Sequence, residues 1–282
     1  RDRASRRSSY VGSCYGAHRD LHSFPTRRAS VLPTGDLIRW LGSTVAGISS
    51  MFQVANRGKR SIVVDLRHAD GLAIIRDLIA EADVLVQNFR PGVAERLGVA
   101  YDDVRSIRPD IVYADLTGFG PGGPYSQRRA YDTVIQAQSG LAASQTGIND
   151  DQPKFLKQLV CDKVTAYTAC QAITAALFAR DRGAGGQHLE LSMLDACIAF
   201  LFVDGADHEV VLDGDHSGPQ SVAANNTPLV FDGGFAAVTV PGDDEFHGLA
   251  SAMGVDSSDP DLATIQDRSE ERRVGKECRS RW

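Results

Sequence analysis

The sequence lacks the spacings with which cysteine builds disulfide frameworks or metal sites. Its five cysteines, at positions 14, 161, 170, 197 and 278, form no CxxC pair and are scattered along 282 residues. Scattered cysteines are typical of a protein that works in a reducing compartment. No His, Asp or Glu spacing repeats on one helix face either. We therefore expect a cytoplasmic protein without a metal site.

Long apolar runs are absent as well. No run reaches the ~18 residues that a membrane-spanning helix needs, and the first residues show no apolar core followed by a small-residue cleavage site. Hydrophobic residues make up 43% and charged residues 23% of the chain, which are ordinary values for a globular protein. We predict a protein that neither spans a membrane nor carries a secretory signal.

Several motifs of hydrolases and nucleotide-binding enzymes are missing. The sequence has no G-x-S-x-G elbow and no GxxxxGK[ST] loop. The stretch GFGPGG (118–123) follows a predicted strand, but Pro124-Tyr125-Ser126 comes next instead of a helix. A dinucleotide site needs a helix there, because the helix N-terminus binds the pyrophosphate. We exclude a nicotinamide or flavin site, and this stretch is either a substrate-flanking loop or a plain surface turn.

Positive charge is concentrated at the two ends of an acidic chain. Residues 1–30 carry a net +5 and residues 268–282 a net +3, whereas the whole chain carries −6, which leaves −14 for the body between them. Basic tails can bind nucleic acid, but a body this acidic opposes it. The stretches DLHSFPTRRAS (20–30) and RSEERRVGKECRSRW (268–282) resemble translated sequencing-adaptor sequence and lack periodicity. We interpret both ends as non-native, disordered tails without function.

Between these tails, short β-rich runs alternate with amphipathic helices. Strand–helix–strand repetition predicts a parallel sheet with flanking helices, connected by right-handed crossovers. We assign residues 31–207 to a large Rossmann-like α/β domain whose first strand is missing. The predicted strands are 61–66, 83–89, 110–120 and 187–193, and the main predicted helices are 70–82 and 163–180.

The beginning of a smaller α+β domain is predicted at residues 208–267. Residues 208–227 are polar without a clear period and indicate a linker. The stretch TPLVFDGGFAAVTV (227–240) predicts a hairpin that turns at Asp232-Gly233-Gly234. Residues 243–254 predict a helix with acidic residues in its first turn.

One acid, Asp162, directly precedes the small-residue helix predicted at 163–180. The simpler interpretation is an N-cap, because an aspartate oxygen accepts hydrogen bonds from the first turn of a helix. The functional interpretation uses the same physics: the helix dipole keeps the carboxylate ionised, and a poorly hydrated carboxylate can act as a covalent nucleophile. The two interpretations are compatible.

A second candidate site is QNFRPGVAERLG (87–98). Asn88 and Phe89 end a parallel strand, at the sheet edge where such folds bind ligands. Phe89 offers a flat face for stacking a base, and Arg90 and Arg96 can bind phosphates as planar forks. The alternative is a strand–turn–helix with solvated arginines. We expect a polyanionic small ligand if the first interpretation holds.

Together these stretches resemble the class III CoA-transferases, a family that includes formyl-CoA and carnitine-CoA transferases and 2-methylacyl-CoA racemases. The resemblance runs from about Gly35 to Met253. The matching stretches are NRGKRSIVVDL, ADVLVQNFRPGVAERLG, IVYADLTGFGPGGPY, AYDTVIQAQSG, GAGGQHLELSMLDA and DGGFAAVTV.

The resemblance implies an acyl-CoA:carboxylate CoA-transferase that binds an acyl-CoA and a carboxylic acid, holds no permanent cofactor and forms an interlocked homodimer. It implies that Asp162 is the catalytic residue, which forms an aspartyl anhydride and then an aspartyl-CoA thioester. It also implies coenzyme A contacts at Val64, Asp65, Leu66, Arg67, Asn88, Phe89, Arg90, Arg96, Arg129, Ala130, Tyr131 and Asp132.

Departures from the family pattern leave two alternatives. The racemase branch would place a histidine at position 131, where this chain has Tyr131, and two-base racemisation then lacks a partner. Arg67 and Arg129 stand where close relatives have lysine. We expect native sequence to be missing before residue 31 and after Gln266. A 2-methylacyl-CoA racemase and an inactive acyl-CoA-binding fragment are therefore the alternatives to the transferase.

Overall fold

The computed structural model describes most of the first 205 residues and short segments of the rest. The described residues are 10–14, 26–30, 36–145, 152–205, 210, 212–213, 228–231, 234–238, 243–255 and 265. The chain divides into two compact units, Arg1–Leu141 with Phe155–Phe200, and Ala142–Lys154 with Leu201–Trp282.

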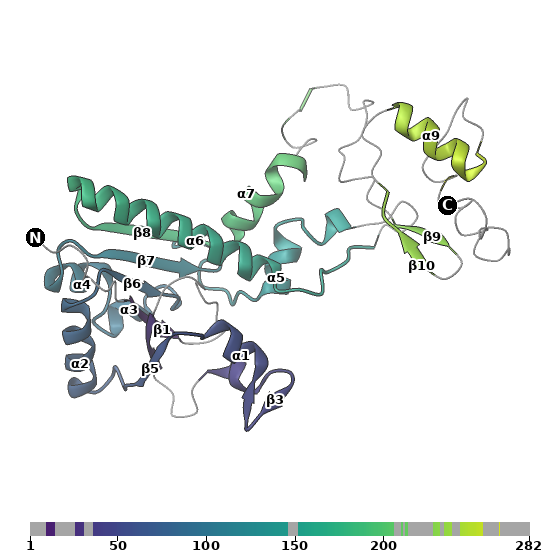
Figure 1. The fold of residues 1–282 in the computed structure, drawn as a ribbon. Helices are drawn as coiled ribbons and strands as arrows, with labels where there is room; N and C mark the ends of the chain where they lie inside the picture. Colours follow the sequence, from purple (N-terminus) through teal and green to yellow (C-terminus); the bar gives the residue numbers. More distant parts are fainter. Residues whose placement is uncertain are drawn as a thin grey trace, which may run out of the picture. The chain divides into compact units, whose positions relative to one another are not determined.

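The first unit is built on a six-stranded sheet in the order β5-β2-β1-β6-β7-β8 (Figure 1). Every neighbouring pair in this sheet is parallel. The predicted parallel sheet is therefore confirmed. Its strands are β1 (Tyr10–Cys14), β2 (Thr26–Ser30), β5 (Arg60–Val63), β6 (Val84–Gln87), β7 (Val112–Thr117) and β8 (Gln187–Ser192).

Helices cover both faces of this sheet, as side-chain alternation along the strands requires. Leu85 and Tyr113 face a core cluster formed with α2 (Ala69–Ala80), α3 (Val93–Arg96) and α4 (Tyr101–Ile107). Val84, Val112 and Ala114 face the opposite cluster, which includes Ile173 and Ala176 of α6 (Val160–Ala179). A strand that is buried on both faces has a continuous apolar run, and β6 and β7 have this pattern.

Shorter elements connect or extend the main ones. In chain order, four short elements lie between β2 and β5, namely η1, β3, β4 and α1. Helix α5 lies between β7 and α6. Their bounds are η1 Leu37–Trp40, β3 Thr44–Val45, β4 Ile48–Ser49, α1 Ser50–Ala55, α5 Asp132–Gln138, η2 Ala143–Gln145, η3 Arg180–Ala184 and α7 Met193–Gly205.

Strands β1 and β2 lie within residues 1–30, where we expected a disordered tail. The structure instead places them in the sheet, between β5 and β6, whereas we expected the first strand of this domain to be missing. The ladder hydrogen bonds of a parallel strand are made by its backbone. Segments without a strand-like pattern of side chains can therefore occupy these positions. The foreign origin of residues 1–30 stays a prediction.

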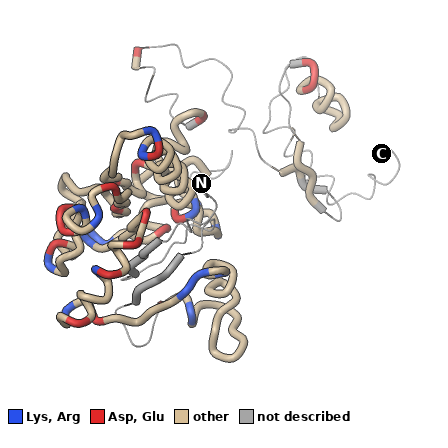
Figure 2. Tube along the Cα trace, turned by 60° about the vertical axis from the view of Figure 1, so that its left-hand side comes forward, with Lys and Arg blue, Asp and Glu red and all other residues tan. Residues whose placement is uncertain are grey.

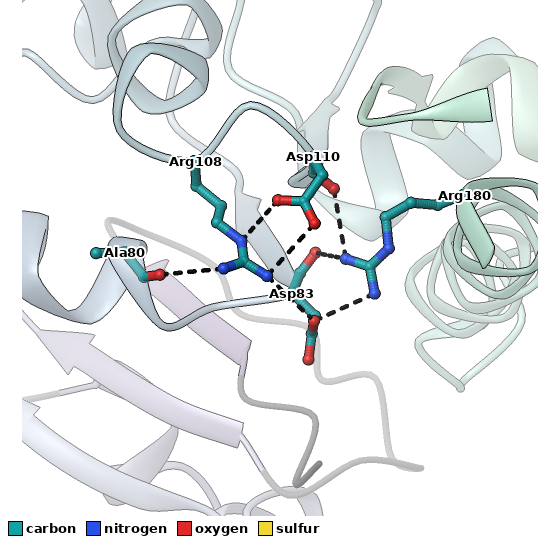
Figure 3. Close-up of polar contacts among 5 residues, drawn as sticks. All are labelled: Ala80, Asp83, Arg108, Asp110 and Arg180. Carbon is teal, nitrogen blue, oxygen red and sulfur yellow. Dashed lines mark hydrogen bonds and ion pairs between the residues drawn. The ribbon is translucent and has the colours of Figure 1, made fainter. Parts of the chain in front are cut away.

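A cluster of charged side chains joins α6 to the amino ends of β6 and β7 (Figure 3). Arg180 donates to the Asp83 carboxylate at 3.1 Å and to the backbone oxygens of Asp83 and Asp110 at 3.3 and 3.4 Å. Arg108 pairs with Asp110 at 2.7 Å and lies 4.0 Å from Asp83. This clasp fixes the last turn of α6 at the end of the sheet opposite to the carboxyl ends of the strands.

The second unit contains an antiparallel hairpin of β9 (Leu229–Phe231) and β10 (Gly234–Ala236), followed by α9 (Asp243–Met253). The two predicted strands and the predicted helix are thus present. Of the predicted turn, Asp232 and Gly233 lie outside the described residues, and Gly234 is the first residue of β10. Leu229, Ala250 and Met253 are buried together in a small cluster. Most of the predicted linker at 208–227, and all of residues 268–282, lie outside the described residues.

Candidate active site

Asp162 is the third residue of α6, and its side chain is only 5% exposed. Helix α6 begins at Val160, three residues before the predicted start, and its N-cap position is Leu159. The interpretation of Asp162 as the N-cap is therefore wrong, because the helix extends past it. The carboxylate lies within the first turn, where backbone N–H groups and the helix dipole favour a negative charge.

The backbone of Asp162 is bound by a second buried acid, Asp132. This residue is the first of α5, which packs against α6. Its Oδ2 accepts a hydrogen bond from the Asp162 N–H at 3.1 Å, and its Oδ1 accepts one from Gln136 Nε2 at 2.5 Å. Only 3% of Asp132 is exposed. We predicted that Asp132 contacts coenzyme A, and the structure shows its carboxylate bound to the main chain of Asp162.

Gln136 has no exposed surface and was not predicted to take part in the site. Its Nε2 also lies within hydrogen-bonding distance of the Leu156 and Gln158 oxygens, at 3.3 and 3.2 Å, and its Oε1 accepts from the Leu156 N–H at 2.9 Å. The side chain therefore fixes the segment that leads into α6. The signal in the sequence was the i, i+4 spacing of Asp132 and Gln136, which places both on one helix face.

The segment 64–67 follows β5, and buried and exposed residues alternate along it. Val64 and Leu66 are buried in the core cluster below the sheet, whereas Asp65 and Arg67 are exposed. Arg67 donates to the Asp65 carboxylate at 3.0 and 3.1 Å. These bonds, together with one from the Arg67 backbone, lower the pKa of Asp65 from its ordinary value. A phosphate that binds Arg67 has to compete with this carboxylate.

Asn88, Phe89 and Arg90 follow β6 at the same edge of the sheet. Phe89 is 3% exposed and packs in the core cluster, so its ring is not available to stack on a base. That expectation was wrong because the apolar ring completes the core instead. The Phe89 N–H donates to Gln87 Oε1 at 2.7 Å, which fixes the main chain of this turn.

Two arginines of this region are exposed to solvent. Arg90 precedes the turn at Gly92, and Arg96 lies on α3. Gly92 has a φ of +82°, and a Cβ built on it would lie 3.5 Å from Arg96 Nη1. Arg96 therefore folds back over the turn that Arg90 begins, and both cations lie beside the carboxyl end of β6.

The segment Arg129–Asp132 is fixed at the carboxyl end of β7. A Cβ on Gly118 would overlap the Ala130 side chain, so the two residues pack directly against each other. The Gly118 oxygen also accepts a hydrogen bond from the Leu194 N–H at 3.1 Å. The contact with Gly118 places Ala130 close to the end of β7. The neighbouring Arg129 and Tyr131 are exposed. The loop 118–123 consequently runs beside this part of the candidate site.

Asp115 of β7 is an acid that sequence reasoning missed. It pairs in register with Gln87 of β6 and Glu190 of β8. Burial, and then the charges of Glu190 and Glu95, raise its pKa to about 6, against a smaller opposing effect of a hydrogen bond with Gln87. A carboxyl group with this pKa exchanges a proton near neutral pH, close to the carboxyl end of the sheet.

The structure brings the predicted residues together in two groups. Asp132 touches Asp162, and Val64, Leu66 and Phe89 share one core cluster. The carboxyl ends of β5, β6 and β7 lie at one edge of the sheet because these strands are parallel. Figure 1 shows α5 beyond the end of β7 at this edge. Among the residues that the structure describes, no three His, Cys, Asp or Glu side chains are arranged to hold a metal ion.

Comparisons with known proteins point to one family. The family model described as CoA-transferase family III matches residues 32–281. The chain is similar to an acetyl-CoA:oxalate CoA-transferase of Acetobacter aceti, with 40% identity over 171 residues, which are 59% of this chain and 43% of that protein. It is also similar to a succinate–glutarate CoA-transferase of Agrobacterium fabrum, with 32% identity over 215 residues, 73% of this chain and 52% of that protein.

The fold has a close counterpart among solved structures. The crystal structure of a CAIB/BAIF family protein from Brucella suis superposes with a TM-score of 0.73 and 27% identity, and covers 95% of this chain and 74% of that one. The chain spans about half or less of the length of the curated relatives it matches. The family match includes residues 268–281, and their foreign origin stays a prediction.

Proposed function

This chain belongs to CoA-transferase family III, and from that premise we propose that it exchanges coenzyme A between an acyl-CoA and a carboxylic acid through Asp162. The observation that carries the proposal is the buried carboxylate in the first turn of α6. Loss of hydration makes a carboxylate oxygen more reactive, and the helix dipole favours a negative charge at the first turn. Carboxylates with these properties serve as covalent nucleophiles.

The proposed reaction needs four acyl transfers. An Asp162 oxygen attacks the thioester carbonyl, the C–S bond breaks, and coenzyme A leaves as a thiolate from a mixed anhydride. The thiolate then attacks the Asp162 carbonyl carbon, which releases the donor acid and leaves an aspartyl-CoA thioester. The acceptor carboxylate attacks this thioester to form a second anhydride. The thiolate finally takes the acceptor acyl group and restores the Asp162 carboxylate.

No step of this sequence consumes a proton or an electron. The substrate and the product are both thioesters, so the energy of one bond is conserved in the next. The difficulty lies in excluding water, which would hydrolyse the anhydride or the aspartyl thioester. The burial of Asp162 supports the proposal for this reason also.

Coenzyme A is the polyanion to which the exposed cations can bind. Arg90, Arg96 and Arg129 are exposed beside the carboxyl ends of the strands. Guanidinium groups bind phosphates through two parallel hydrogen bonds. Figure 2 shows acidic and basic residues interspersed over the described helices of the first unit, which argues against a nucleic-acid surface there.

A homodimer is the proposed assembly. The part of α7 that the structure describes exposes large apolar side chains, among them Phe200 at 57% and Phe202 at 55%. Exposed apolar surface of this kind is what a subunit interface buries.

Among the described helices, none combines the length and the hydrophobicity required to cross a bilayer.

The names of the relatives suggest which acids to test first. They act on oxalate, succinate and glutarate, which are all small dicarboxylates. We propose a small carboxylate of this class as the acceptor, and its CoA ester as the product.

The decisive experiment replaces Asp162 with alanine in the purified protein, in the longest form that its source gene encodes. We expect transfer to fall at least about 1,000-fold, because the covalent route is lost, while acyl-CoA binding is retained. Asp70→Ala is the matched control, since Asp70 lies in the first turn of α2 and is exposed. Retained turnover in the Asp162 variant would refute the proposal.

Two further measurements separate the alternatives. Hydroxylamine added during turnover should attack the activated Asp162 carbonyl of the wild-type protein, release the donor acid or the coenzyme A thiolate, and leave a hydroxamate on Asp162. Deuterium exchange at the α-carbon of an acyl-CoA, without any acceptor acid, would indicate the racemase instead. Binding of acyl-CoA with neither trapping nor exchange would indicate the inactive acyl-CoA-binding alternative.

A further inference from the structure

We propose that Asp132 is a positioning residue for Asp162 and not a coenzyme A contact, and that Gln136 completes this function. The inference rests on the proposed role of Asp162 as nucleophile. It starts from the beginning of α6, where the N-cap residue Leu159 has no side-chain acceptor. A helix begins with backbone N–H groups that have no partner inside the helix. The Asp132 carboxylate supplies one such partner, for the N–H of Asp162 itself.

Both oxygens of Asp132 are engaged in the protein interior. Oδ2 accepts from the Asp162 N–H and Oδ1 accepts from Gln136 Nε2. A ligand could reach this carboxylate only through the 3% of Asp132 that is exposed. Arg129 and Tyr131, which flank the same turn, are exposed and offer the ligand contacts instead.

Gln136 makes the arrangement rigid. Its amide nitrogen lies within 3.3 Å of three acceptors, Asp132 Oδ1 and the Leu156 and Gln158 oxygens, while its amide oxygen accepts from the Leu156 N–H. A glutamine side chain can do both at once, because its amide nitrogen donates to a carboxylate while its amide oxygen accepts from a backbone N–H. The amide therefore holds α5 and the segment before α6 together, with Asp132 between them.

This brace determines where the reacting oxygen lies. The Asp162 side chain is one carbon long before its carboxylate, so a shift of the Asp162 backbone moves the carboxylate by a similar amount. A misplacement of about 1 Å costs a reaction of this kind roughly 100-fold in rate. Loss of the Asp132 hydrogen bond should therefore appear in kcat, whereas loss of a coenzyme A contact would appear in the KM for acyl-CoA.

The test compares Asp132→Ala and Asp132→Asn with Asp103→Ala. Asp103 caps α4 through a hydrogen bond from the Ala100 N–H at 3.0 Å, so its loss removes an equivalent cap outside the site. We expect kcat to fall about 100-fold in Asp132→Ala, with the KM for acyl-CoA within about threefold of wild type, and no change of kcat in Asp103→Ala. Asp132→Asn keeps one acceptor oxygen and should retain more kcat than the alanine variant.

A second measurement does not depend on activity. Hydrogen exchange of the Asp162 amide should become faster in Asp132→Ala and Gln136→Ala, and stay as in wild type in Asp103→Ala. If the wild-type protein shows no transfer, the proposed function fails, and amide exchange still decides whether Asp132 holds Asp162. If Asp132→Ala does not fold, Asp132→Asn takes its place in both measurements.

Three outcomes would overturn the inference. An unchanged kcat in both Asp132 variants would show that Asp162 needs no such support. A raised KM at constant kcat would make Asp132 a coenzyme A contact. Unchanged exchange of the Asp162 amide in Asp132→Ala would show that the hydrogen bond between them contributes nothing to holding the backbone.

Discussion

Replacing Arg180 with methionine removes the guanidinium that joins the end of α6 to the starts of β6 and β7, and keeps most of the aliphatic stem. Arg180 makes three hydrogen bonds in this clasp, one of them to the Asp83 carboxylate at 3.1 Å (Figure 3). The side chains of Arg180 and Asp83 are only 15% and 20% exposed. The Asp83 carboxylate would then be left half-buried, with Arg108 4.0 Å away as its remaining cation.

The expected cost lies between two limits. An exposed ion pair contributes about 0–1 kcal/mol, and breaking a fully buried one costs about 3–5 kcal/mol. At the exposure of Arg180 and Asp83 we expect the free energy of unfolding to fall by about 2 kcal/mol. For a unit of this size, that corresponds to a midpoint lowered by roughly 4–8 °C.

Chemical and thermal denaturation followed by circular dichroism measures this change. The control is Arg67→Met, because Arg67 also donates to a carboxylate, that of Asp65, but the side chains of this pair are 76% and 47% exposed. The control should unfold at the wild-type midpoint. Equal midpoints for Arg180→Met and Arg67→Met would refute the argument that partial burial gives the clasp its strength.

The remaining predictions concern the carboxyl half of the sheet. Asp115→Asn should stabilise the protein at pH 7 by about 1–2 kcal/mol, because the folded state raises the pKa of Asp115 to about 6 from an ordinary 3.8 and solvent screens part of this effect. The wild type should lose this stability as the pH rises from about 4 to about 6. Denaturation curves at pH 4 and pH 7 should therefore show the advantage of the variant only at pH 7. Gly118→Ala should destabilise the protein by about 1–3 kcal/mol, because its methyl group overlaps Ala130. Ala130→Gly in the same chain should restore much of that loss in urea denaturation, and an unrelieved double variant would contradict the packing argument.

The sequence predicted best those elements whose signal is local. The apolar runs of β6 and β7 and the periodicity of α2 are properties of single segments, and all three elements occur where they were expected. The hairpin of the second unit was equally local, since its turn residues and flanking strands adjoin in the chain.

What the sequence could not show depends on partners distant in the chain. The start of α6 was placed three residues late because aspartate is a strong capping signal, whereas the acceptor for its first turn comes from Asp132, thirty positions earlier. Phe89 looked like a ligand-binding face because it ends a parallel strand and carries a flat ring, yet it packs in the core cluster with side chains of α2, α3 and α4. Gln136 gave no signal beyond its spacing from Asp132, since its other partners belong to the segment before α6.

Helix α6 is attached at both ends, by Arg180 to the sheet and by Asp132 to α5. A helix that is held at both ends has little freedom to shift along its axis or to rotate when a substrate binds. If Asp162 is the proposed nucleophile, acids of different size must be accommodated by movement of the substrate or of the surrounding loops, because the backbone of Asp162 is held in place. In such an enzyme, a change of substrate specificity would arise from changes in the loops, while helix α6 stays unchanged.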